Sequence, residues 1–146
     1  MTCIEPNQRF REARERLKLS VDEAAALCGI SAPCVWDIEW DATELATCYS
    51  AMEVFRFSEA LCIPASAFFG DDVPGTPVSA DALSDLIFEE CRGRGISLER
   101  FEDLAGWKLS ESMEPPVRLL EDMTLDGLQW LCRELRIDWR RVLAKP

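Results

Sequence analysis

Histidine is absent from this chain of 146 residues, and so are several other features that direct a protein to chemistry. Its absence excludes the common zinc sites that use imidazole and removes the base that most often activates a nucleophile. The seven cysteines form no Cys-x-x-Cys pair, so an all-cysteine metal site lacks its usual spacing. No glycine-rich phosphate loop is present, and no carboxylate pair is distinct from the generally acidic sequence. We expect no catalytic site, no metal and no cofactor, and we interpret the cysteines as small hydrophobic residues rather than metal or redox groups.

Long hydrophobic runs are also missing. No apolar run approaches the roughly 18 residues that a transmembrane helix needs. The N-terminus has no basic segment followed by an apolar stretch, as a signal peptide would. We therefore expect a cytoplasmic protein with no membrane partner. Hydrophobic residues make up 48% of the chain, enough to bury a core in one ordinary domain or two small ones.

Positive charge is scarce, with 16 basic against 27 acidic residues and a net charge of −11. Proteins that neutralise DNA phosphates normally present clustered Lys and Arg. The net field of this chain has the opposite sign. The local potential at a docking surface decides, however, so net charge alone does not exclude DNA.

One stretch near the N-terminus predicts two short helices joined by a glycine. Ser20 and Glu23 form a capping box, so a helix should begin at Val21. Gly29 suits the left-handed conformation that ends a helix, and Ser31 is a good N-cap for the next one. Helix, glycine turn and helix at this length is the helix-turn-helix motif. The positions expected to face inward are Ala24, Leu27 and Cys28 in one helix and Val35 and Ile38 in the other.

Further helices are predicted on both sides of this motif. A helix is expected over residues 7–18, and a loop from Asp41 to Thr47. Ser50 and Glu53 form a second capping box, which predicts a helix from about Ser50 with Val54, Phe57 and Leu61 inside. Pro64 should be the first residue of a short last helix ending at Gly70.

The pattern then repeats beyond a stretch rich in turn formers. A shift of 77 residues places Ser20, Leu27 and Gly29 on Ser97, Leu104 and Gly106, and later the best shift is 74. Three residues are missing around the second recognition helix, which Pro115 and Pro116 also interrupt. We interpret this as a degenerate internal duplication; shared apolar spacing between unrelated helices is the alternative. The expected domains are residues 1–70 and 80–146, joined by a linker at 71–79.

The first 70 residues resemble the Cro/repressor-type (XRE, lambda-repressor-like) helix-turn-helix family. The resemblance rests on Leu19-Ser20, the Ala-rich second helix, the segment 27–31, Val35 with Ile38-Glu39, and the closing Leu61-x-Ile63. It implies an all-α fold of two five-helix bundles in tandem, the second one degenerate. Two such units in one chain would mimic the two-fold dimer through which these repressors usually bind.

The resemblance also assigns the residues that would meet DNA. In such domains the third helix enters the major groove, which places base-reading positions at Ala32, Pro33 and Asp37. Alanine and proline offer no hydrogen bonds to base edges, and Asp37 stands where the family often has Arg or Lys. The second helix starts with Val21 and Asp22, where the family commonly has a glutamine that holds a phosphate.

Trp36 and Trp40 lie four residues apart, on one face of the predicted recognition helix. Asp37, Asp41 and Glu44 lie in the same region. Exposed tryptophan beside acidic residues is typical of a protein–protein hot spot. The alternative is that both tryptophans pack onto the second half of the chain.

Two groups of arginines are candidate contacts for phosphate or for an acidic partner. Alternation of the first group with Glu12 and Glu15 also fits a self-paired helix face, and the second group also fits favourable charge at the carbonyl end of the last helices. The groups are Arg9, Arg11, Arg14 and Arg16, and Arg140 and Arg141.

The sequence therefore favours a non-enzymatic regulator that acts by protein contact through an acidic, aromatic recognition face. An anti-repressor, anti-activator, inhibitor or DNA mimic would fit. The alternative is a DNA-binding transcriptional regulator of the XRE type. No small-molecule substrate is indicated, and a homodimer is compatible with either hypothesis.

Overall fold

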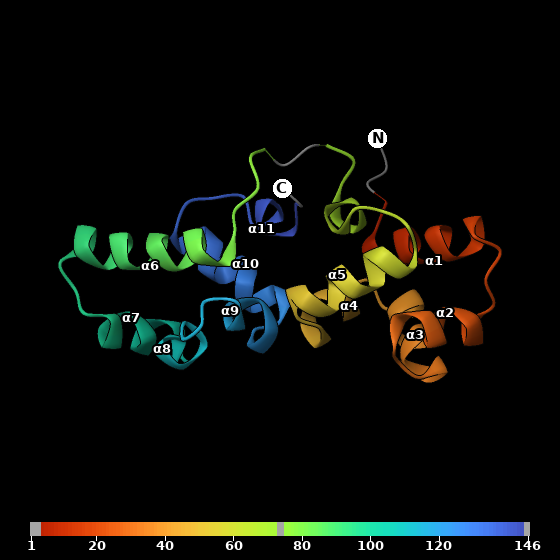
Figure 1. The fold of residues 1–146 in the computed structure, drawn as a ribbon, viewed down its shortest axis with the longest axis horizontal. Coiled ribbons are helices and arrows are strands. Elements are labelled where there is room, and N and C mark those ends of the chain that lie inside the picture. Colours follow the sequence, from red (N-terminus) through yellow and green to blue (C-terminus); the bar gives the residue numbers. More distant parts are fainter. Residues whose placement is uncertain (1–3, 73–74, 145–146) are drawn as a thin grey trace.

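The chain folds entirely into helices in its computed structural model, which describes residues 4–72 and 75–144. Eleven α-helices and one 3₁₀-helix, with no β-strand, lie within these two ranges. None of these helices is long and apolar enough to cross a membrane. An elongated molecule results, with α1–α3 at one end, α6–α8 at the other, and α4, α5, α9 and α10 in the middle (Figure 1). The all-α fold class is thus confirmed.

The first half contains six elements. They are α1 (Pro6–Arg16), α2 (Val21–Cys28), α3 (Ala32–Trp40), α4 (Glu44–Cys48), α5 (Ala51–Ala60) and the 3₁₀-helix η1 (Ala65–Phe69). The second half also contains six. They are α6 (Ala80–Arg94), α7 (Leu98–Ala105), α8 (Leu109–Ser112), α9 (Arg118–Asp122), α10 (Leu125–Glu134) and α11 (Arg140–Leu143).

Local sequence signals place several helix ends where they were predicted. The Ser20 hydroxyl accepts from the backbone N–H of Glu23, whose carboxylate accepts from the Ser20 N–H, so α2 begins at Val21. Gly29 ends α2 in the left-handed conformation, at φ 72°. A second capping box at Ser50 starts α5 in the same way.

Other predictions about the first half were wrong in detail. Asp41–Thr47 is not a loop throughout, because α4 begins at Glu44 after the Asp41 carboxylate accepts two hydrogen bonds from Thr43. Pro64 precedes η1 as its N-cap. The predicted helix 7–18 ends at Arg16 because Lys18 adopts a positive φ of 56°. Leu27 is 55% exposed, because the buried face of α2 is centred on Ala24, Ala25 and Cys28.

The second half repeats the element order of the first. Helices α2 and α7 are eight residues long and start 77 residues apart. The pairs α4 and α9, and α5 and α10, match in length at an offset of 74. Left-handed turn residues recur at the same offsets, in the pairs Lys18 and Gly95, Gly29 and Gly106, and Cys62 and Arg136. The repetition therefore extends to backbone conformation.

Corresponding helices exchange contacts across the middle of the molecule. Helix α4 packs against α10, and α5 packs against α9, so each half offers the same two elements to the other. An isolated antiparallel bridge joins Ser50 to Thr124, two residues that are 74 apart. Next to it, the backbone N–H of Leu125 donates to the carbonyl of Tyr49. This reciprocal arrangement is the one that two-fold dimers have at their interfaces.

Buried side chains from both halves form one continuous core. Phe10, Phe57 and Phe68 are fully buried in the first half, and Leu125 and Leu131 in the second. The segment between the halves is also held, since the Val78 N–H donates to the Arg141 carbonyl. The domain boundaries at residues 70 and 80 stay a prediction.

Candidate functional site

One face of α3 is made of exposed residues that differ from those expected of a DNA reader. Pro33, Trp36, Asp37 and Trp40 are all exposed and follow the spacing i, i+3, i+4, i+7, so they form one line along the helix. We call these four residues the α3 stripe. Trp36 is 49% exposed and Trp40 74% exposed, which contradicts the alternative that both pack onto the second half. Ala32, at the start of α3, is half-buried beside the stripe.

The opposite face of α3 explains why the stripe points outward. Val35 and Ile38 are fully buried, and the carboxylate of Glu39 is only 1% exposed. Burying a charge requires a partner, and Arg14 on α1 provides it: its Nε lies 2.5 Å from Glu39 Oε1. A hydrogen bond from Arg14 to that carboxylate raises the pKa of its guanidinium. Glu39 therefore fixes the orientation of α3 against α1.

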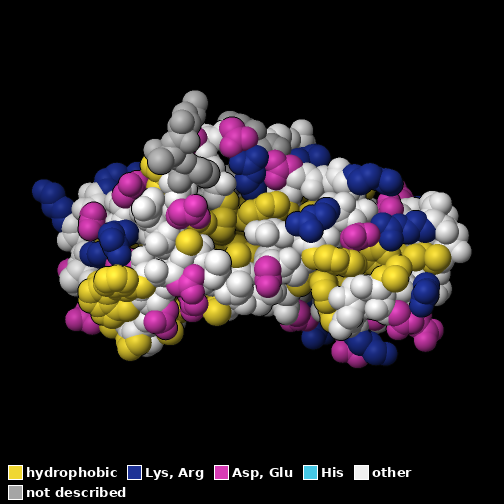
Figure 2. Space-filling model, turned by 180° about the vertical axis from the view of Figure 1, so that it is seen from behind, with side chains coloured by type: hydrophobic (Ala, Val, Ile, Leu, Met, Phe, Trp, Pro, Cys, Tyr) yellow, Lys and Arg dark blue, Asp and Glu magenta, His cyan; other side chains and the backbone are white. Residues whose placement is uncertain are grey.

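Helix α2 adds further acidic and apolar surface. Asp22 and Leu27 are exposed, and Val21 is half-buried. Exposed large hydrophobic residues on neighbouring helices exceed the isolated apolar side chain that is normal on a surface. Figure 2 shows hydrophobic side chains gathered at the end of the molecule formed by α2 and α3, with Asp and Glu side chains beside them.

Cations are absent from a long part of this region. No Lys or Arg lies between Lys18 and Arg56, a span that contains all of α2, α3 and α4. The same span contains Asp22, Glu23, Asp37, Glu39, Asp41, Glu44 and Glu53. A surface that bound DNA would need Lys or Arg to replace the counterions of the phosphates. Reading cation positions along the sequence, rather than total charge, would have revealed this gap.

The N-terminal arginines interact with other parts of the same chain. Arg14 pairs with Glu39, and Arg11 donates to the Glu39 carbonyl while its guanidinium lies 6.0 Å from the centre of the Trp40 ring. Arg16 donates to the carbonyls of Leu61 and Cys62. Arg9 pairs with Asp71 at 2.6 Å, and this hydrogen bond lowers the pKa of that carboxyl. These four residues fasten α1 to α3, to the end of α5 and to the linker.

The C-terminal arginines also have partners within the chain. Arg140 pairs with Asp72 at 2.6 Å and with Asp138 at 2.8 Å, and its hydrogen bonds lower the pKa of both carboxyls. Arg141 donates from Nε to the carbonyl of Thr76. Both arginines thus hold residues 72–76 against α11. All six arginines singled out from the sequence have contacts inside the molecule.

The second half has a reduced version of α3. Its counterpart, α8, has four residues against nine in α3. Leu109, Ser112 and Met113 are buried with the same spacing as Val35, Ile38 and Glu39, which lie 74 residues earlier. The offset changes from 77 to 74 between Gly106 and Leu109, so the missing residues correspond to the first turn of α3. The second half therefore lacks the turn that would meet base edges.

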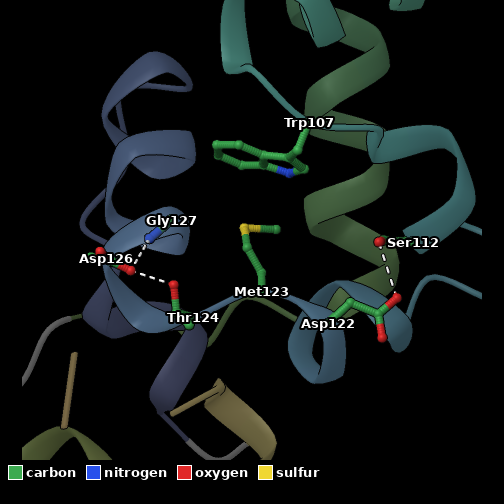
Figure 3. Close-up of a pocket in the computed structure, with 7 residues that line it drawn as sticks. All are labelled: Trp107, Ser112, Asp122, Met123, Thr124, Asp126 and Gly127. Carbon is green, nitrogen blue, oxygen red and sulfur yellow. Dashed lines mark hydrogen bonds between the residues drawn. The ribbon is translucent and has the colours of Figure 1, made fainter. Parts of the chain in front are cut away.

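A pocket of about 430 Å³ lies beside this shortened helix (Figure 3). Trp107 and Met123 form its apolar wall, and Ser112 donates to the Asp122 carboxylate at 3.1 Å. On the other side, Asp126 accepts from Thr124 and from the Gly127 N–H at the start of α10. Both carboxylates are thus engaged in holding their own helices, which is a structural role.

A groove of about 640 Å³ runs along the seam between the two halves. Phe55 from the first half and Leu120 from the second supply apolar lining. Exposed Met52 and Val117 lie on its rim. No group of three or more potential metal ligands occurs within residues 4–72 and 75–144.

The cysteines divide by depth. Cys28, Cys91 and Cys132 are buried, and desolvation raises the pKa of Cys28 to about 11 and of Cys132 to about 12. Such thiols remain protonated and behave as small hydrophobic residues. Cys48 and Cys62 are exposed, and Cys3 lies outside the described residues.

Comparison with protein-family models, with curated proteins and with solved structures finds no match for this chain. The function must therefore be argued from the α3 stripe and its surroundings.

Proposed function

We propose that this protein is a non-enzymatic regulator that works by binding another protein through the α3 stripe. The observation that carries the proposal is the composition of the stripe: two exposed tryptophans flank Asp37, within a span that has no Lys or Arg. Tryptophan is the residue most enriched at energetic hot spots of protein interfaces, because it buries a large rigid surface.

The scaffold under this surface is, in our proposal, a pair of helix-turn-helix bundles in one chain. The left-handed Gly29 between α2 and α3, and the matching Gly106 after α7, support it. The reciprocal packing of α4 on α10 and of α5 on α9 supports a two-fold arrangement of the halves. The first half keeps the shape of a DNA reader while its surface suits a protein.

DNA binding is the second candidate, because the same α2–turn–α3 arrangement is the one that enters a major groove. The charges oppose it. The stripe offers one carboxylate and no cation, and the arginines nearest to it are paired with Glu39. A protein partner therefore agrees better with the contacts and charges of this surface.

Site-specific photo-crosslinking tests the proposal. A photoreactive phenylalanine analogue placed at position 36 or 40 in the full chain, in the cell that encodes it, should form a defined cross-link to another protein. Position 88 on α6 is the matched control, since Phe88 is also aromatic and is 43% exposed. Cross-linking no stronger at 36 and 40 than at 88 would remove the proposed function.

A titration with mixed-sequence duplex DNA tests the second candidate. We expect no change in fluorescence anisotropy of a labelled 30-base-pair duplex, even at low salt. Phosphate contacts would instead give binding that falls steeply with salt, each contributing about −0.9 to the log–log slope. That result would favour the DNA-binding alternative.

A further inference from the structure

The two halves of the molecule differ in charge at corresponding positions. Glu23 in the first turns of α2 corresponds to Arg100 in α7, and Glu44 in α4 corresponds to Arg118 in α9, at the offsets set by the helix bounds. Lys108 adds a cation in the short connection before α8. The cation-free acidic surface is therefore confined to the first half.

Within that half, the acidic groups lie in exposed positions around an apolar centre. Asp22, Asp37 and Asp41 are exposed, and Glu44 is half-buried at the start of α4. Capping hydrogen bonds from Thr43 lower the pKa of Asp41, so that carboxylate stays charged well below neutral pH. A partner that covers the tryptophans must also accept this negative charge. An acidic or neutral partner surface would pay an electrostatic cost, whereas Lys and Arg would be attracted.

We propose that the partner of the α3 stripe presents a cationic surface of the kind that binds nucleic-acid phosphates, and that this chain occupies that surface in place of the nucleic acid. The proposal rests on the proposed function and names its partner by charge. Carboxylates at Asp22, Asp37 and Asp41 would stand where phosphates otherwise bind. Trp36 and Trp40 would contact apolar parts of the same surface.

Fractionation on a phosphate matrix provides the probe. A nuclease-treated lysate of the encoding organism is separated on phosphocellulose into retained and unretained proteins, and the immobilised full chain is offered each pool. We expect the partner in the retained pool, and we expect a 30-base-pair duplex in excess to release at least nine-tenths of it.

Charge reversal gives a matched comparison. The double variant Asp22→Lys, Asp37→Lys should hold at least tenfold less of the partner than the wild type. The double variant Asp85→Lys, Glu89→Lys changes the net charge equally at exposed positions of α6, and should change binding less than twofold. Circular dichroism confirms that both variants keep their helices.

The outcomes separate the two proposals. Binding that depends on Trp36, as judged with Trp36→Ala, but comes from the unretained pool or resists duplex DNA, overturns the cationic partner and leaves the proposed function in place. Equal loss in both double variants overturns it as well, since net charge would then suffice. Binding that Trp36→Ala leaves unchanged overturns both.

Discussion

Glu39 is the residue whose placement controls the surface of α3. Its carboxylate is buried and meets Arg14, and Arg11 Nε lies 3.9 Å from it. A buried charge that loses its partner is costly, because the remaining ion has neither water nor a counter-charge. The second half avoids the requirement altogether, with Cys91 and Met113 at the corresponding positions.

We therefore expect Glu39→Gln to lower the free energy of unfolding by about 3 kcal/mol, since Arg14 would keep its charge without the carboxylate. Urea unfolding followed by helical circular dichroism measures it. Glu12→Gln, on the exposed face of α1, is the control and should stay within about 0.5 kcal/mol of the wild type. A Glu39→Gln loss as small as the control would show that Arg14 finds another partner.

The residue scale also shows where sequence reasoning stopped. The capping boxes at Ser20 and Ser50 predicted two helix starts correctly, because their hydrogen bonds are local. The exposure of Leu27 was missed, since α2 could place either Leu27 or Ala25 inward with helical spacing and only the packed neighbours decide. The partners of Arg14 and Arg140 were missed because Glu39 and Asp72 are distant in sequence.

At the scale of elements, α2 depends on Gly29 for its end. Its φ of 72° lies in the left-handed region, which a side chain makes unfavourable, although a Cβ there would meet Arg56 only at an ordinary 3.8 Å. Gly93 differs, since it lies inside α6 with no positive φ and with open space around it. The two glycines thus provide opposite tests of helix design.

Gly29→Ala should lower the free energy of unfolding by about 1 kcal/mol, and Gly93→Ala should raise it by about 0.5 kcal/mol. The loss arises from left-handed strain, and the gain from the lower entropy of alanine in the unfolded chain. Thermal and urea unfolding of the two variants against the wild type measure both. The same sign in both variants would contradict the turn conformation described for Gly29.

At this scale the sequence predicted which helices exist better than how long they are. The repeat at 77 and 74 residues followed from apolar spacing, and the helix bounds follow the same offsets. Helix α4 was missed because five residues are too few for a periodic pattern. The shortened α8 could not be read from sequence, since its start depends on burial of Leu109 against the core.

For the whole molecule, the joint core is the dominant feature. Leu125 is fully buried at the start of α10, and its N–H donates to Tyr49 of the other half. Helices from both halves meet around it, so a loss of packing there should be felt by each. Such coupling predicts one cooperative unfolding transition.

We expect Leu125→Ala to cost about 3 kcal/mol, the usual loss for a buried leucine. Hydrogen exchange read by mass spectrometry along a urea series should give one midpoint for peptides from α1 and α6, lowered equally in both. Leu104→Ala is the control, because Leu104 is 52% exposed and its loss should cost less than about 0.5 kcal/mol. Separate midpoints for the two peptides would show that the halves unfold independently.

The pairing of α4 with α10 and of α5 with α9 has a consequence for how such a surface can change. Two separate subunits meet only as fast as their concentration allows, whereas tethered halves have a high effective concentration at any dilution. Identical subunits must also share every substitution. Here Glu23 faces its counterpart Arg100 in the same polypeptide, and Glu44 its counterpart Arg118, so each side carries its own charge. A single chain can thus keep the geometry of a symmetric pair while giving its two ends different tasks.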